Sequence, residues 1–132
     1  MDHAELQRFG MSYAAAWCSQ SAACVAEFYE EGGSLQINLG LPSVGRSSIA
    51  ATAKSFMTAF PDMVVSMVDV SANQDGAIFQ WTLAGTNTGP GGTGNAVQIG
   101  GYEIWQFGGT GLILRSRGHF DEADYQRQLN VR

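Results

Sequence analysis

The stretch MVVSMVDVSANQDGAIFQWTLAGTNTGPGGTGNAVQIGGYEIWQFGGTGLILRSRGHF, residues 63–120, decides the fold. Apolar and polar residues alternate along most of it, which is typical of half-buried strands. Polar and glycine-rich segments divide it, and this division predicts strands at residues 63–72, 77–88, 96–107 and 112–120. Four successive long strands with short connections indicate a meander sheet rather than a parallel α/β sheet.

Apolar residues at helical spacing precede this stretch. Asp2 and Glu5 match a capping box, which predicts that a first helix starts there and ends near Ser19. Ser21 can cap a second, shorter helix, and the glycine pair at residues 32–33 is expected to stop it. These helices would cover one face of the sheet, because an amphipathic helix must bury its apolar side.

The middle of the chain gives three further predictions. Alternation at residues 35–39 predicts a short strand, and residues 40–45 read as a loop. A third helix is predicted from Ser47 to Phe60, where the following Pro61 ends it. With a short closing helix or turn at residues 122–129, the 132 residues are expected to form one α+β domain. Its N-terminal helices would pack into a strongly bent, mostly antiparallel sheet that encloses a pocket.

Composition and charge exclude several kinds of partner. The net charge is -5, and the seven Lys and Arg residues are scattered, so neither nucleic acid nor an anionic membrane surface is an expected partner. No segment approaches the roughly 20 apolar residues of a membrane helix. We find no signal-peptide pattern either, which predicts a cytoplasmic protein with Cys18 and Cys24 as reduced thiols.

The motifs of cofactor and metal sites are not convincing. Gly89, Gly91 and Gly94 spell G-x-G-x-x-G, but a strand pattern follows where the dinucleotide fingerprint needs a helix. His3 and His119 are the only histidines, and the two cysteines lack metal-ligand spacing. We therefore expect neither a cofactor nor a metal.

A polar row on the last strand is the main candidate site. Arg115, Arg117, His119 and Asp121 share one face because side chains alternate along a strand. In one interpretation this face is solvated and Asp121 caps the following turn. In the other, Asp121 lies at the cavity mouth, where burial raises its pKa and makes it a general base. His119 would then stabilise an oxyanion or hold Asp121 in place.

A second acid, Glu103, stands inside an apolar strand beside Tyr102. Pairing of Phe107 with Leu112 would place Tyr102 on the Asp121 face. A one-residue bulge in the turn would bring Glu103 there instead, and the sequence leaves both registers open.

Aromatic residues could line the cavity or fill an ordinary core. The expected lining set is Tyr13, Trp17, Phe56, Phe60, Trp81 and Trp105. Tyr102 and Arg117 complete the expected substrate-binding residues.

Five fragments, taken in their order and spacing, resemble the SnoaL-like polyketide cyclase family of the NTF2-like superfamily. They are YAAAW (13–17), FYEEGG (28–33), GRSSI leading to AFPD (45–62), GTNTGP (85–90) and FDEADYQRQL (120–129). The resemblance implies a cone-like α+β barrel that dimerises through the outer surface of its sheet.

The resemblance also implies a catalytic residue. Family cyclases use an aspartate near the end of the last long strand to remove a proton from a carbon between carbonyls, and Asp121 matches it. The chain departs from the family at Cys18–Gln20, where Asn and His are common, and at Trp105 and Phe107, which replace polar pocket residues.

Three hypotheses for function follow. The leading one is a cofactor-independent lyase or isomerase acting on a small, apolar or aromatic carbonyl compound, with Asp121 as base and His119 or Tyr102 stabilising the enolate. The alternative is a non-catalytic small-molecule carrier or sensor. A third is epoxide-hydrolase-like activation of water by Glu103, Arg117 and Asp121.

Overall fold

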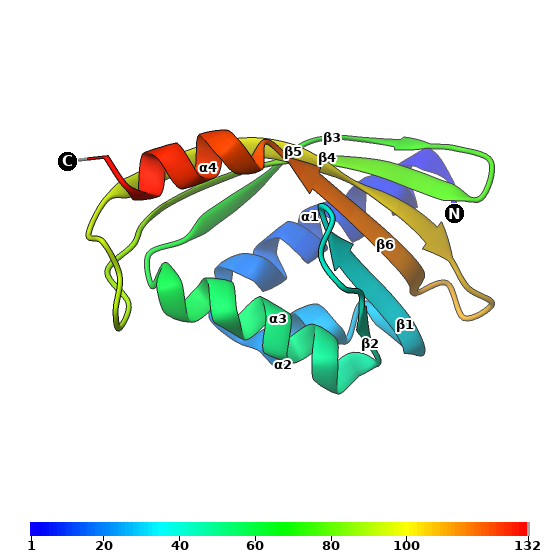
Figure 1. Cartoon of the computed structure of the whole chain (residues 1–132). Coiled ribbons are helices and arrows are strands. Elements are labelled where there is room, and N and C mark those ends of the chain that lie inside the picture. Colours follow the sequence, from blue (N-terminus) through cyan, green and yellow to red (C-terminus); the bar gives the residue numbers. More distant parts are fainter. Residues whose placement is uncertain (132) are drawn as a thin grey trace.

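A computed structural model of the chain describes residues 1–131, which form four helices and six strands (Figure 1). The helices are α1 (His3–Cys18), α2 (Ala22–Ala26), α3 (Arg46–Ala59) and α4 (Glu122–Leu129). The strands are β1 (Tyr29–Ile37), β2 (Ser43–Val44), β3 (Val64–Ala72), β4 (Gly76–Thr86), β5 (Ala96–Phe107) and β6 (Ile113–Phe120).

The predicted meander is confirmed. Strands β3 to β6 pair antiparallel in chain order, within one sheet ordered β2-β1-β6-β5-β4-β3. Strand β1 adds to β6 in parallel, and β2 pairs with β1 inside the region predicted as a loop. The sheet is thus mostly antiparallel and bends around the helices, as the α+β prediction required (Figure 1).

Helix α1 forms as its sequence predicts. The Asp2 side chain accepts a hydrogen bond from the Glu5 backbone N–H at 2.8 Å, and the helix ends at Cys18. Its buried face carries Leu6 and Trp17 and packs against the sheet. N-terminal capping and apolar spacing are both local signals, which explains why this element could be located from the sequence.

The second helix is shorter than predicted. Helix α2 ends at Ala26, and residues 29–37 form strand β1 rather than the end of a helix. A Cβ at Gly33 would lie 3.0 Å from the Ile113 carbonyl oxygen, so this glycine permits the close approach of β1 to β6. The glycine pair that resembled a helix stop therefore marks an irregularity in a parallel strand pair.

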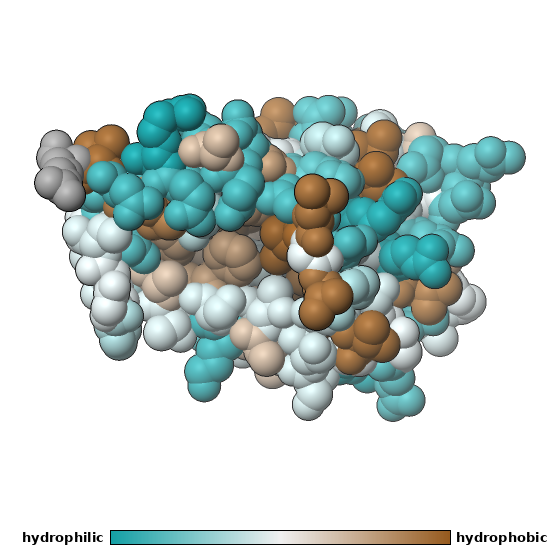
Figure 2. Space-filling view, viewed as in Figure 1, coloured by the Kyte–Doolittle hydropathy of each residue, from teal (hydrophilic) through white to brown (hydrophobic). Residues whose placement is uncertain are grey.

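The sheet has a concave inner face and an outer face. Glu103 pairs with Gly118, and Tyr102 pairs with His119, so these two pairs point to opposite faces. The inner face packs with α1 and α3 around a buried core, whose largest side chains include Tyr13, Phe60 and Trp105. Apolar side chains are recessed in the opening between α4 and α3, beneath the polar surface of α4 (Figure 2).

No helix within residues 1–131 combines the length and the apolar character that crossing a membrane requires.

Candidate active site

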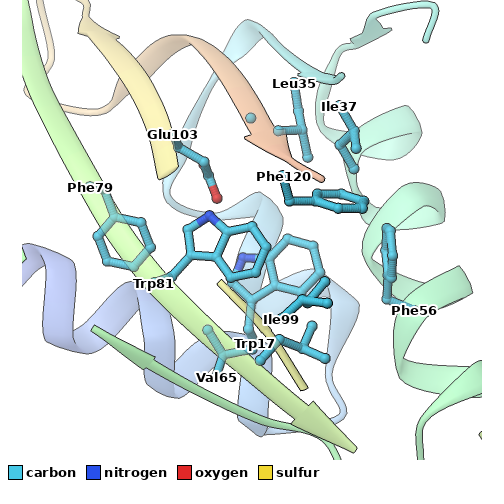
Figure 3. Close-up of a pocket in the computed structure, with 12 residues that line it drawn as sticks. Trp17, Leu35, Ile37, Phe56, Val65, Phe79, Trp81, Ile99, Glu103 and Phe120 are labelled. Atoms are coloured by element: carbon cyan, nitrogen blue, oxygen red, sulfur yellow. The ribbon is translucent and has the colours of Figure 1, made fainter. Parts of the chain in front are cut away.

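An apolar cavity of about 60 Å³ lies between the concave face of the sheet and the helices (Figure 3). A single water needs about 10–15 Å³ on this measure, so the cavity can hold several heavy atoms. Its walls include Trp17, Leu35, Phe56, Val65, Trp81 and Phe120. Glu103 is the one ionisable residue among the described residues that line it.

The cavity adjoins a wider groove at the open end of the cone. Ile37, Phe56 and Phe120 line both spaces, and Glu122 and Tyr125 of α4 belong to the groove alone. The groove has a volume of about 570 Å³. A small chamber with a larger apolar mouth can hold the reacting end of a molecule while the remainder lies outside.

Two inward-facing glycines, Gly101 on β5 and Gly118 on β6, have different roles near the cavity. Gly118 lines the cavity, and a Cβ there would lie 3.6 Å from Glu103, so its missing side chain leaves space beside the carboxyl group. A Cβ at Gly101 would overlap the His119 carbonyl oxygen and lie 2.6 Å from the Trp81 ring. Gly101 therefore permits close packing of the Trp81 ring against the sheet.

Three donors converge on one oxygen of Glu103. Its Oε1 atom accepts hydrogen bonds from Ser116 Oγ at 2.6 Å, Trp105 Nε1 at 2.9 Å and the Tyr13 hydroxyl at 3.0 Å. Tyr13 also bonds the Tyr29 hydroxyl at 2.7 Å. Because a phenol has one hydrogen and Tyr13 gives its hydrogen to Glu103, Tyr29 is the donor in that bond.

The strands and α1 bring these groups together. Glu103 and Trp105 are two residues apart on β5, so both face inward, and Trp105 pairs with Ser116 on β6. Tyr13 reaches the carboxyl group from α1. Described residues donate no hydrogen bond to Glu103 Oε2, which leaves that oxygen available to a molecule in the cavity.

Burial raises the pKa of Glu103 above its ordinary value of 4.5, because the charged form loses hydration. The hydrogen bonds from Ser116, Trp105 and Tyr13 oppose this effect by stabilising the carboxylate. Burial, followed by the charge of Glu103, also raises the pKa of Tyr13 well above 10, so the phenol remains a neutral donor. The result is a buried carboxyl group suited to exchange a proton.

Asp121 does not face the cavity, so the prediction of its orientation was wrong. Its side chain is exposed and caps α4 by accepting a hydrogen bond from the Asp124 backbone N–H at 3.0 Å. Strand β6 ends at Phe120, whose side chain takes the inward position and lines the cavity. The alternative interpretation, in which Asp121 caps the following segment, is confirmed.

The remaining polar row lies on the outer face of the sheet, contrary to the expectation for His119, Tyr102 and Arg117. The rings of Tyr102 and His119 stack there with centroids 5.0 Å apart, and Tyr102 is 42% exposed. Arg117 is exposed and pairs with Ile104. Since Glu103 points inward, the trio of Glu103, Arg117 and Asp121 does not come together.

Phe107 lies opposite Ile113 rather than Leu112, and the strand register shifts just before Phe107. Because of this shift, Tyr102 shares a face of the sheet with His119. That shared face is the solvated one. Glu103, which the alternative register would have joined to the polar row, faces the cavity instead.

The aromatic set divides between wall and core. Trp17, Phe56 and Trp81 line the cavity, as expected. Tyr13, Phe60 and Trp105 are fully buried and fill the core instead, although Tyr13 and Trp105 support Glu103. Sequence reasoning missed Ser116, since a single serine in a strand gives no sign that it faces a carboxylate.

Within residues 1–131, no three His, Cys, Asp or Glu side chains gather as a metal site would require. Both cysteines are free thiols, and Cys18 exchanges hydrogen bonds with the backbone of Val65.

Solved structures share this fold over nearly the full chain. TsrD from Streptomyces laurentii has a TM-score of 0.84 at 18% identity, with 98% of each chain covered. A protein with a ketosteroid isomerase-like fold from Catenulispora acidiphila, solved with trimethylamine, gives 0.81 at 13% identity and covers 94% of this chain and 93% of its own. The epoxide hydrolase/cyclase-like enzyme SalBIII gives 0.78 at 18% identity, covering 93% and 95%.

The bent sheet, the covering helices and these likenesses show an NTF2-like, ketosteroid isomerase-like fold. Residues 7–129 match the family described as SnoaL-like polyketide cyclase. The chain therefore belongs to the SnoaL-like polyketide cyclase family, as its sequence fragments suggested. No match was found among curated proteins.

Proposed function

We propose that the protein is a cofactor-independent acid–base enzyme of the cyclase or isomerase type, acting on a small, mostly apolar carbonyl compound. One observation carries the proposal: Glu103 is a buried carboxyl group with one oxygen held by three donors and the other available to an apolar cavity. Apolar walls around one positioned acid–base group suit proton transfer at carbon.

In the proposed reaction, Glu103 Oε2 removes a proton from the carbon next to a carbonyl group. The C–H electron pair forms the C=C bond of an enolate, and the carbonyl π pair moves to oxygen. Oε1 stays fixed by Ser116, Trp105 and Tyr13, which orients the carboxyl group throughout. The protonated Glu103 then returns the proton to a carbon or oxygen of the product.

Family membership supports this class of chemistry, because the family is described as polyketide cyclases. SalBIII is described as an epoxide hydrolase/cyclase-like enzyme in pyran ring formation. The fold hosts more than one reaction, so the local residues must determine which one occurs here.

Hydrogen–deuterium exchange tests the proposal without knowledge of the natural substrate. Small cyclic ketones such as cyclohexanone are incubated with the protein in D₂O, and loss of the proton next to the carbonyl is followed by NMR. We expect the protein to accelerate exchange and Glu103→Gln to lower the rate by about 100-fold to 10,000-fold, the usual contribution of a general base. Glutamine can still accept the three hydrogen bonds at Oε1, so the fold should persist.

Asp121→Asn provides the matched comparison, because it also changes one carboxylate to an amide. Asn remains a good N-terminal cap, so we expect exchange to continue at the wild-type rate. Loss of exchange in Asp121→Asn, with activity kept in Glu103→Gln, would instead return the role of base to the residue that the family resemblance indicates. Asp121 could act as the base only if the start of α4 moved, because its side chain is exposed in this structure.

The second candidate is a non-catalytic small-molecule-binding domain. The relay from Tyr29 through Tyr13 to Glu103 favours it, because such a network can also serve only to satisfy a buried carboxyl group. This function predicts saturable ketone binding without exchange at any pH between 5 and 9, a range of about four units that spans the usual optimum of a carboxylate base.

A further inference from the structure

We infer that the indole N–H groups of Trp17 and Trp81 together bind one uncharged oxygen acceptor, the carbonyl oxygen of a small ketone or enone. Both Nε1 atoms are buried, and neither meets hydrogen-bond geometry with a partner among residues 1–131; the nearest acceptor to Trp17 is the Tyr13 hydroxyl, whose pKa burial raises and this indole lowers slightly. The third tryptophan differs, since Trp105 Nε1 donates to Glu103 at 2.9 Å. This inference rests on the proposed function, because it names the ligand class of the same cavity.

Unpaired buried donors are uncommon in folded proteins. More than nine-tenths of buried backbone polar groups, and most buried side-chain polar atoms, have a partner. Two unpaired donors in the wall of one small cavity therefore indicate a partner that the described chain does not supply. Trp17 is only 7% exposed, so bulk water does not meet this need from outside.

The two indoles come from different elements and meet at the cavity. Trp17 lies near the end of α1, and Trp81 lies in the middle of β4. Figure 3 shows both rings beside the cavity, with the Trp81 nitrogen toward Glu103 and the Trp17 nitrogen behind the Trp81 ring. A ligand between these rings would meet both donors beside the carboxyl group.

These groups specify the chemistry of the ligand. Indole N–H groups only donate, so the ligand needs an acceptor, and a carbonyl oxygen has lone pairs for two donors. The apolar walls disfavour a ligand that carries a full charge in its resting state. As Glu103 removes the adjacent proton, negative charge develops on this oxygen, and the two N–H bonds strengthen. Trp17 and Trp81 would thus be oxyanion donors.

Spectroscopy of the indole N–H groups tests the inference directly. The chain has three tryptophans, so ¹⁵N-labelled protein gives three indole signals, and Trp105 serves as an internal reference. We expect cyclohexanone to shift the Trp17 and Trp81 signals strongly and the Trp105 signal weakly. Methylenecyclohexane has the same shape without the oxygen, and it should shift the same two signals much less. Equal shifts from both compounds, or a ketone response confined to Trp105, would overturn the inference.

Removal of each donor provides a second measurement. Trp17→Phe and Trp81→Phe keep an aromatic wall but lose the N–H, and each should weaken cyclohexanone binding about tenfold, the value of one hydrogen bond. Binding of methylenecyclohexane should change little. If a variant does not fold, the signals of the wild-type protein still decide the matter.

A failure of the indole inference can be distinguished from a failure of the proposed acid–base function. The indole shifts are measured again in Glu103→Gln, which should bind ketone but not exchange its protons. Ketone-specific shifts without exchange in the wild type would keep the inference and reject the enzymatic function. Exchange that depends on Glu103, without such shifts, would reject the inference alone. A water molecule that fills the site permanently would appear as indole signals that ketone cannot change, which also rejects it.

Discussion

The two carboxylate oxygens of Glu103 have different surroundings. Oε1 receives all three hydrogen bonds from Ser116, Trp105 and Tyr13, whereas Oε2 receives none from described residues. This asymmetry allows the network to hold the side chain in one orientation and leaves one oxygen to react. Both oxygens of a carboxylate can accept hydrogen bonds, so Oε2 keeps its full capacity to accept one from a bound molecule.

The raised pKa of Glu103 predicts a pH dependence of stability. The folded state holds this proton more tightly than the unfolded state, whose pKa is near 4.5. The stabilising contribution of protonated Glu103 to the free energy of unfolding is therefore full below about pH 4.5, and it is lost as pH rises through the folded pKa. Relative to Glu103→Gln, the wild-type free energy of unfolding should fall with rising pH, by about 1.4 kcal/mol for each unit by which the pKa is raised. Urea denaturation at pH 4.5 and above measures it.

Glu30 provides a control of opposite sign. Hydrogen bonds from Thr110 lower its pKa, so its contribution is present above its unfolded pKa and decreases as pH falls. Relative to Glu30→Gln, the wild-type free energy of unfolding should therefore rise with rising pH. The rise should be slight, because Glu30 is on the surface. A pH-independent difference between wild type and Glu103→Gln would contradict the raised pKa.

Single residues were the hardest part to predict. Glu103 stood out as the acid inside an apolar strand, but its direction depended on a register shift at Phe107 that residue types do not encode. Asp121 matched the family aspartate, yet the next residues favour a helix, and the local cap fixed its side chain outside. Trp17, Phe56 and Trp81 were identified because large aromatic residues in a bent sheet are candidates for any cavity wall.

At the scale of elements, the junction of β6 and α4 decides which residue enters the cavity. Phe120 is the last residue of the strand and points inward, and Asp121 begins the next element as its cap. Asp121→Ala should lower the free energy of unfolding by about 1 kcal/mol, the usual value of an N-terminal cap. Thermal denaturation measures this loss, and Asp121→Ser should restore most of it. Equal stability of all three proteins would show that the cap is unimportant.

Gly118 offers a way to reduce the cavity without changing the strand. Its added Cβ in Gly118→Ala would meet the Gln36 carbonyl oxygen and Glu103 Cγ at 3.6 Å, which is ordinary contact, so folding should persist. The methyl group would occupy space beside the carboxyl group, and ketone binding by titration should weaken about tenfold. Gly109→Ala is the matched control, because nothing lies within 4 Å of its Cβ. Equal binding by both variants would contradict the assigned position of the cavity.

Elements with local signals were predicted well. Strands β3 to β6, helices α1 and α3, and the closing helix α4 follow from apolar period, caps and turn residues. Strand β1 was assigned in part to a helix because its conformation depends on pairing with β6, far along the sequence. Tertiary pairing of this kind overrides local preference.

At the scale of the molecule, the outer face of the sheet remains available for association. Tyr102 is exposed there beside His119, and Val64 is exposed on the edge strand β3. We expect a homodimer through this face, with a mass by light scattering of twice the 14.1 kDa chain. Tyr102→Asp should shift the protein toward monomers, because a charge would be buried.

Ala51→Asp introduces the same charge on an exposed position of α3, away from the outer face, and should leave the mass unchanged. A monomeric wild type, or equal masses for all three proteins, would reject this interface.

The parallel pairing of β1 with β6 has a consequence for biosynthesis. Leu35 pairs with Ser116, so the wall that carries Leu35 cannot close until the segment that forms β6 has left the ribosome. Contacts between such distant segments form slowly, because a long loop must first be ordered. The nascent protein would therefore expose the future lining of its chamber until β6 emerges, and pairing of β1 with β6 would shield it.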